Sequence, residues 1–197
     1  MLSTQPKWAP MSNSPLQAIA AQKRAENIVE YVLYVWQMED LLRGASFNPD
    51  ALRGFLAAGM ELDQVEMEMR WLAELGGRMK RQDVMEKGHV REVEEVLAEL
   101  VYLHRTLLGV IKDEGYTKTY KQCEPAILDL MERSMGAARN EVEACLTGVY
   151  GLLMLRLKKQ SITEATSKTL QAIAGLMGQL ALHYKSMRQG ADQASLN

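Results

Sequence analysis

The stretch NIVEYVLYVWQMEDLLR, residues 27–43, decides the fold of this chain. At about 100° per residue, its apolar side chains cover almost the whole circumference of a helix. Only a narrow stripe that contains Glu30 and Gln37 is polar enough to face water. A helix that is apolar nearly all round is normally buried by other elements. The stretch therefore predicts an interior helix of an all-α protein.

A second helix of this kind is predicted over residues 140–159, and the remaining helices have one apolar face each. No alternation typical of strands is found elsewhere in the sequence. We therefore expect an all-α, single-domain bundle of about six or seven helices with two largely buried central helices. The predicted helices are 16–43, 50–58, 62–81, a segment from 87 or 89 to 109, a segment from about 125 with a short helical lead-in, 140–159 and 163–187.

Length and composition favour one globular domain. The chain has 197 residues and is 47% hydrophobic, which is enough for a sizeable core. No Gly/Ser-rich linker and no repeat period divides it. We expect a flexible N-terminal tail over residues 1–15, a single domain over 16–189, and a frayed C-terminal tail over 190–197. Met11 is an alternative start to Met1.

Charge and cysteine content exclude several classes of protein. The net charge is −2, and Lys and Arg are scattered, so the basic patch of a nucleic-acid-binding protein is missing. The two cysteines are too few for a disulfide framework, which favours the cytoplasm. The longest apolar run, residues 145–157, is too short to span a bilayer, and the N-terminus lacks an apolar signal core. We therefore expect no nucleic acid and no membrane among the partners.

Several charged side chains fall on apolar helix faces, where a charge is costly unless it is paired. A histidine likewise lies in the middle of the apolar face of residues 87–109. We call these residues the predicted polar cluster: Glu39, Asp40, His104 and Arg156, with Glu143 and Arg43 as neighbours. Two interpretations stay open. The cluster is a structural network that sets helix register, or it is a ligand-binding or acid–base site inside the bundle.

A weaker metal candidate lies in the sequence EKGH. Glu86 and His89 have the Glu-x-x-His spacing of di-iron helical bundles. Such a site needs two of these motifs and two further carboxylates, and here the motif occurs once. The spacing therefore favours a role as capping groups at a helix start. Cys123 and Cys145 also lack metal-binding spacing, and no cofactor is expected.

Four stretches together resemble an uncharacterised bacterial family of small all-α proteins, a domain of unknown function. They are NIVEYVLYVWQMEDLLR, the EKGH sequence, the LH of VYLHRTLL, and YGLLMLRLKK. The resemblance covers nearly the whole chain after the N-terminal tail. It implies an all-α fold and a cytoplasmic setting, and it implies no activity.

Two hypotheses for function follow. The first is a non-enzymatic cytoplasmic protein that acts through protein contacts, with a homodimer as one form, because two all-apolar helices need much covering surface. The second is a small-molecule- or metal-binding protein, or an enzyme, that uses the predicted polar cluster. Serine-nucleophile motifs, phosphate-binding glycine loops and dinucleotide fingerprints are missing from the sequence, so no named chemistry is indicated.

Overall fold

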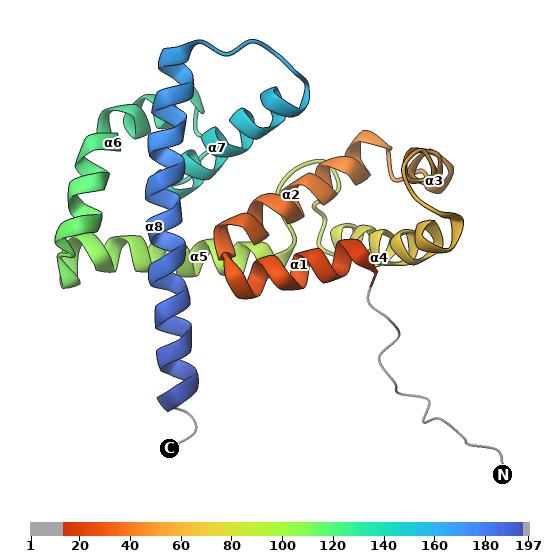
Figure 1. The fold of residues 1–197 in the computed structure, drawn as a ribbon, viewed down its shortest axis with the longest axis horizontal. Helices are drawn as coiled ribbons and strands as arrows, with labels where there is room; N and C mark the ends of the chain where they lie inside the picture. Colours follow the sequence, from red (N-terminus) through yellow and green to blue (C-terminus); the bar gives the residue numbers. More distant parts are fainter. Residues whose placement is uncertain (1–13, 195–197) are drawn as a thin grey trace. The chain divides into compact units, whose positions relative to one another are not determined.

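The computed structural model describes residues 14–194, with side chains described for residues 14–191. This range is helical throughout its regular structure and contains no strand, which confirms the predicted all-α class. The helices are α1 (Pro15–Glu26), α2 (Ile28–Gly44), α3 (Pro49–Ala57), α4 (Leu62–Arg81), α5 (Arg91–Thr106), the π-helical turn η1 (Leu107–Ile111), α6 (Glu114–Arg133), α7 (Glu141–Leu157) and α8 (Glu164–Ala194) (Figure 1).

The described range thus holds eight α-helices, whereas the sequence predicts six or seven. The difference comes from Asn27, which divides the predicted helix 16–43 into α1 and α2. The side-chain oxygen of Asn27 accepts hydrogen bonds from the backbone N–H groups of Val29 (3.1 Å) and Glu30 (3.2 Å). Asparagine competes in this way with the helical hydrogen-bond pattern, so that a new helix starts after it.

The predicted helix start near residue 125 is wrong, because α6 begins at Glu114 and runs through Pro125 without a break. A proline inside a helix removes the hydrogen bond to the carbonyl group four residues earlier. Here that carbonyl belongs to Lys121, and both residues are exposed. Water can therefore satisfy the free carbonyl group, which makes the proline tolerable at this position.

Three helices that are capped by the side chain directly before them begin within one residue of the predicted starts. The hydroxyl of Ser14 accepts from the N–H of Gln17 at 3.0 Å, directly before α1. Asn48 caps α3 by accepting from two backbone N–H groups, and Asn140 caps α7. At its other end the chain stays helical beyond the predicted limit of residue 187, because α8 continues to Ala194. The predicted tail residues 1–13 and 195–197 lie outside the described residues.

The chain divides into two compact units. The first unit contains the described residues up to Gln22 and the segment Tyr34–Val90, and the second contains Lys23–Leu33 and the chain from Arg91 onward. Helices α1 and α2 contribute residues to both units. The single domain over 16–189 stays a prediction.

In the first unit, α4 continues through the Gly76–Gly77 pair. A Cβ atom at Gly76 would lie 3.5 Å from the ring of Phe47 and 3.7 Å from the side chain of Leu42. These are ordinary van der Waals distances, so the two side chains pack against Gly76 without requiring a glycine there. The ring of Tyr34 stacks on Trp71 with 6.4 Å between centroids.

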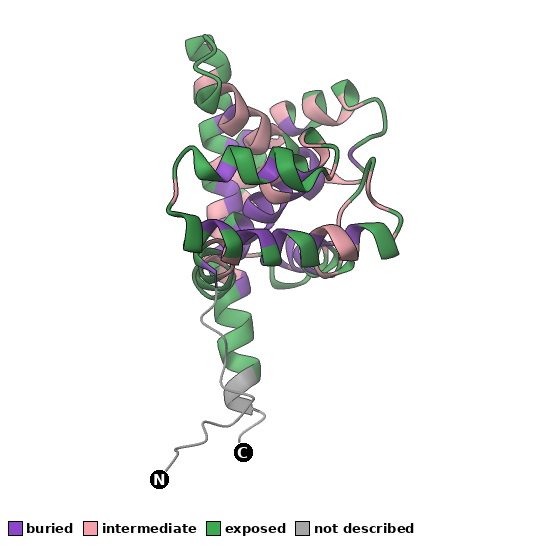
Figure 2. Cartoon of the chain, turned by 90° about the vertical axis from the view of Figure 1, so that its right-hand side faces the viewer, coloured by how far each residue is buried: buried purple, intermediate pink, exposed green. Residues whose placement is uncertain are grey.

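In the second unit, α8 packs against α5, α6 and α7, and in Figure 1 it crosses α5. Its apolar stripe is buried as far as Tyr184, and the residues from 185 to 191 are exposed (Figure 2). The buried residues of this stripe are Leu170, Ile173, Leu176, Met177, Leu180, Ala181 and Tyr184. None of the helices over residues 14–194 combines the length and the apolar composition needed to cross a membrane.

Candidate functional site

The predicted polar cluster divides between the two units. Glu39, Asp40 and Arg43 lie in the first unit, and His104, Glu143 and Arg156 lie in the second. Each group has its hydrogen-bond partners within its own unit.

Glu39 is fully buried and is the centre of the first group. One carboxylate oxygen lies 2.6 Å from Nδ1 of His89, and the other accepts the backbone N–H of Val90 at 2.8 Å. The ring of Trp36 stacks on His89 with 4.4 Å between centroids. Glu39 therefore receives two hydrogen bonds from the segment that directly precedes α5, which satisfies a charge that burial would otherwise make costly.

Arg43 holds the same segment through its backbone. Its guanidinium donates to the carbonyl oxygens of Met85 (3.2 Å), Val84 (3.1 Å) and Gly88. It also donates to the carboxylate of the exposed Asp40 at 3.1 Å. Arg43 thus fixes the turn over residues 84–88 to α2 through three backbone carbonyl groups, which is a structural role.

The metal candidates Glu86 and His89 lie in this turn. His89 faces Glu39, whereas Glu86 is exposed. Across the part of the chain that the structure describes, no three or more His, Cys, Asp or Glu side chains are grouped so that they could hold a metal ion.

His104 is the centre of the second group, and both of its ring nitrogens are engaged. Nδ1 lies 2.8 Å from the hydroxyl of Tyr116, and Nε2 lies 3.0 Å from a carboxylate oxygen of Glu141. The second oxygen of Glu141 accepts the hydroxyl of Tyr120 at 3.0 Å. The result is a continuous chain of hydrogen bonds in the order Tyr116, His104, Glu141 and Tyr120, which we call the His104 chain.

Burial determines the protonation of the two tyrosines in the His104 chain. Burial, and next the nearby Cys145 and Glu141, raise the pKa of Tyr116 far above its ordinary value. Burial and the hydrogen bond to Glu141 likewise raise the pKa of Tyr120. Both phenols therefore keep their protons, and Tyr120 donates its proton to Glu141. In the tautomer of His104 that carries its proton on Nε2, Tyr116 donates to Nδ1 and the Nε2–H donates to Glu141. A proton transfer from a substrate to His104 would require one of these bonds to break.

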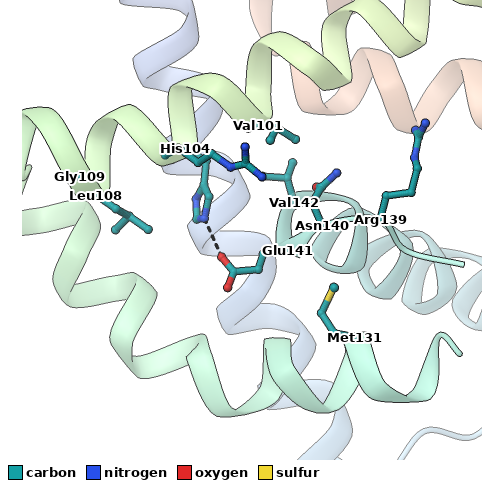
Figure 3. Close-up of a pocket in the computed structure, with 10 residues that line it drawn as sticks. Val101, His104, Leu108, Gly109, Met131, Arg139, Asn140, Glu141 and Val142 are labelled. Atoms are coloured by element: carbon teal, nitrogen blue, oxygen red, sulfur yellow. Dashed lines mark hydrogen bonds and ion pairs between the residues drawn. The ribbon is translucent and has the colours of Figure 1, made fainter. Parts of the chain in front are cut away.

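Two members of the His104 chain, His104 and Glu141, line a pocket of about 500 Å³ (Figure 3). In Figure 3 the imidazole of His104 points at the carboxylate of Glu141, and the side chain of Met131 also lines the pocket. The side chain of Glu141 is 34% exposed, while that of His104 is 6% exposed. Glu141 is therefore the member of the pair that a ligand can reach. The pocket is lined by Val101, His104, Arg105, Leu108, Gly109, Met131, Arg139, Asn140, Glu141 and Val142.

Arg139, at the edge of this pocket, is already paired. It binds Glu143 (3.0 Å from Nε) and Glu94 (2.6 Å from Nη2), and these bonds raise the pKa of its guanidinium, that to Glu143 most. The predicted cluster member Glu143 thus pairs with Arg139. Arg156, which was predicted on an apolar side of its helix, is exposed.

Sequence reasoning found His104 but missed its partners. Tyr116 and Tyr120 are four residues apart on α6, and Glu141 is the first residue of α7. Two tyrosines four residues apart indicate that both lie on the same face of a helix, but this spacing is equally typical of residues in an apolar core. Glu141 looks like an ordinary acidic residue of a first helical turn.

Comparison with known families identifies the family of this chain. The model of the family described as "Domain of unknown function (DUF4924)" matches residues 17–191. The chain belongs to this family. The match spans both units and confirms the resemblance to an uncharacterised family. No curated protein and no solved structure matches this family member.

Proposed function

We propose that this protein binds a small polar molecule in the pocket lined by His104 and Glu141, with Glu141 as the main contact. The observation that carries the proposal is the position of Glu141. Two donors from the protein orient its carboxylate, and a third of its side chain stays open to the pocket. A preoriented carboxylate binds an ammonium or another donor with little loss of side-chain entropy.

The lining of the pocket also favours a ligand that carries a hydrogen-bond acceptor such as a carboxylate. Its volume of about 500 Å³ is in the usual range for small-molecule sites. Arg105 lines it and has no ion pair within the described residues. Because Glu141 and Arg105 have opposite charges, a molecule with both an amino group and a carboxylate matches the lining. Binding of such a zwitterion needs no proton transfer by His104.

A thermal-shift screen tests this proposal. The probes are the twenty common amino acids and putrescine, each added to the full chain. We expect one or more amino acids to raise the melting temperature of the wild-type protein, because a ligand that binds the folded state stabilises it. Glu141→Gln is expected to abolish the shift. Glu132→Gln, which removes an exposed carboxylate outside the pocket, is the matched control and should keep it.

Three results would overturn the proposal. They are the absence of any shift in the wild type, shifts of equal size in Glu141→Gln and the wild type, and loss of the shift in the Glu132→Gln control.

Protein contact is a second candidate, and exposed apolar side chains favour it. Tyr102, Val110 and Ile111 lie close together in the sequence of α5 and η1, and all are large and exposed, Val110 to 79%. A contact of this surface with a second copy would bury them. Light scattering coupled to size exclusion tests the homodimer. A monomer at micromolar concentration would contradict it.

We also propose that α2 and the first half of α7 are interior helices. Every residue from Tyr31 to Trp36 is buried, and α7 is buried from Val142 to Leu146. The end of α7 does not share this role, because Arg156 and Leu157 are exposed. A cytoplasmic location is part of the same proposal, and the two buried free cysteines, Cys123 and Cys145, support it.

A further inference from the structure

A second pocket lies in the same unit and belongs to none of the groups described above. Its volume is about 660 Å³, and it lies where η1 ends and α6 begins. Leu108 borders both this pocket and the one at Glu141. The second pocket, here called the lysine pocket, is lined by Leu108, Lys112, Glu114, Thr117, Lys118, Lys121 and Gln122.

The charge of the lysine pocket is strongly positive for a chain whose net charge is −2. Three of its seven lining residues are lysines, and Glu114 is its only acidic one. Within the range 14–191, no ion pair is formed by Lys112, Lys118 or Lys121, although Glu114 is four residues before Lys118. Three ammonium groups thus line one cavity together with a single carboxylate, that of Glu114, and none of them forms an ion pair with it.

The pattern of the helix explains why these groups share a cavity. Thr117, Lys118, Lys121 and Gln122 are related by steps of three and four residues, so they lie on one face of α6. Lys112 joins them from the turn before the helix, where its left-handed backbone conformation (φ 54°) ends η1. Asp113 caps α6, and its carboxylate accepts the N–H of Tyr116.

Thr117 supplies an independent observation. Its hydroxyl oxygen is buried, and none of the residues that the structure describes forms a hydrogen bond with it. A buried hydroxyl without a partner is unusual, because proteins satisfy nearly all such groups. Thr117 also lines the pocket, so a ligand that displaced the atoms covering its hydroxyl would accept that proton and contact the ammonium groups at the same time.

We propose that the lysine pocket binds a small, multiply charged phosphate compound. Phosphate oxygens carry the charge that three lysines neutralise, and they accept hydrogen bonds from hydroxyl and amide donors. A carboxylate ligand with a single charge would leave two ammonium groups unpaired. This site is separate from that of Glu141, whose carboxylate repels anions.

Isothermal titration calorimetry with inorganic pyrophosphate tests the proposal. We expect the wild-type chain to bind pyrophosphate, and the triple variant Lys112→Gln/Lys118→Gln/Lys121→Gln to bind it about tenfold more weakly or worse. The matched control is Lys158→Gln/Lys159→Gln/Lys185→Gln. It removes three exposed charges of the same unit, and Lys159 has the same left-handed conformation as Lys112. The control should bind nearly as the wild type does.

A second variant and a vesicle assay complete the test. Thr117→Val keeps the shape of the side chain and removes the hydroxyl, so we expect it to weaken binding while the melting temperature does not fall. Co-sedimentation with phosphatidylglycerol vesicles should leave the protein in the supernatant. The proposal is overturned if pyrophosphate does not bind, if both triple variants lose affinity equally, if Thr117→Val binds as tightly as the wild type, or if only the vesicles bind.

Discussion

At the scale of single residues, α2 shows how a buried charge is made stable. Glu39 has no exposed surface, and it receives the N–H of Val90 and faces the ring of His89. Its neighbour Asp40 is half exposed and pairs with Arg43 at 3.1 Å. The two carboxylates are adjacent in the sequence, yet only one of them is surrounded by protein. Their contributions to stability are therefore expected to differ widely.

Substitution of Glu39 tests this difference. Glu39→Ala leaves His89 and the N–H of Val90 without their acceptor inside the protein, so it should lower the free energy of unfolding by about 3 kcal/mol. Asp40→Ala removes an exposed ion pair and should cost less than about 1 kcal/mol. Urea denaturation at neutral pH measures both values. Equal losses in the two variants would contradict the structural role assigned to Glu39.

At the scale of elements, α7 shows how one glycine allows close packing. A Cβ atom at Gly148 would lie 2.9 Å from a methyl group of Leu130 on α6 and 3.1 Å from one of Leu170 on α8. Gly151, one turn further along α7, has nothing within 4 Å of the same position. The two glycines belong to one helix, but only Gly148 is required by its neighbours.

The alanine variants of these two glycines form a matched pair. Gly151→Ala should stabilise the protein by up to about 1 kcal/mol, because alanine favours the helix. Gly148→Ala gains the same helix preference but displaces two leucine side chains, which costs about 1–3 kcal/mol. Gly148→Ala should therefore be the less stable of the two by about that amount. Chemical denaturation measures it, and equal stabilities would show that the leucines move aside freely.

At the scale of the whole molecule, buried tyrosines occur in both units and respond to pH in the same direction. In the first unit, burial and next the charge of Glu68 raise the pKa of Tyr34 to about 12. In the second unit, burial and the hydrogen bond to Glu99 raise the pKa of Tyr184 to about 12. The folded protein therefore holds these protons at a pH where the unfolded chain, with a pKa near 10, releases them.

Alkaline pH should accordingly weaken both units. The stabilisation by a raised tyrosine pKa is complete below pH 10 and is lost as the pH rises from about 10 to 12. Tyr34→Phe and Tyr184→Phe should each make this loss shallower, by up to about 2 kcal/mol over that interval. Urea unfolding at several pH values between 8 and 12 measures the slope. An unchanged slope in both variants would contradict the assignment.

The sequence by itself determined the features that depend on near neighbours. The all-helical class follows from apolar spacing within single helices, and the starts at Ser14, Asn48 and Asn140 follow from side chains that bond two or three residues ahead. The break at Asn27 has the same local cause, but it was missed because the apolar pattern continues across it. Such features need no knowledge of the rest of the chain.

Only the tertiary structure decided which polar groups meet. Glu39 and Val90 are 51 residues apart, and His104 and Glu141 are 37 apart. Helical periodicity tells which face a side chain occupies, but not which residue of another helix lies opposite. The sequence therefore identified Glu39 and His104 as inward-facing polar groups, and their partners follow from the packing of helices and turns that are distant in the chain.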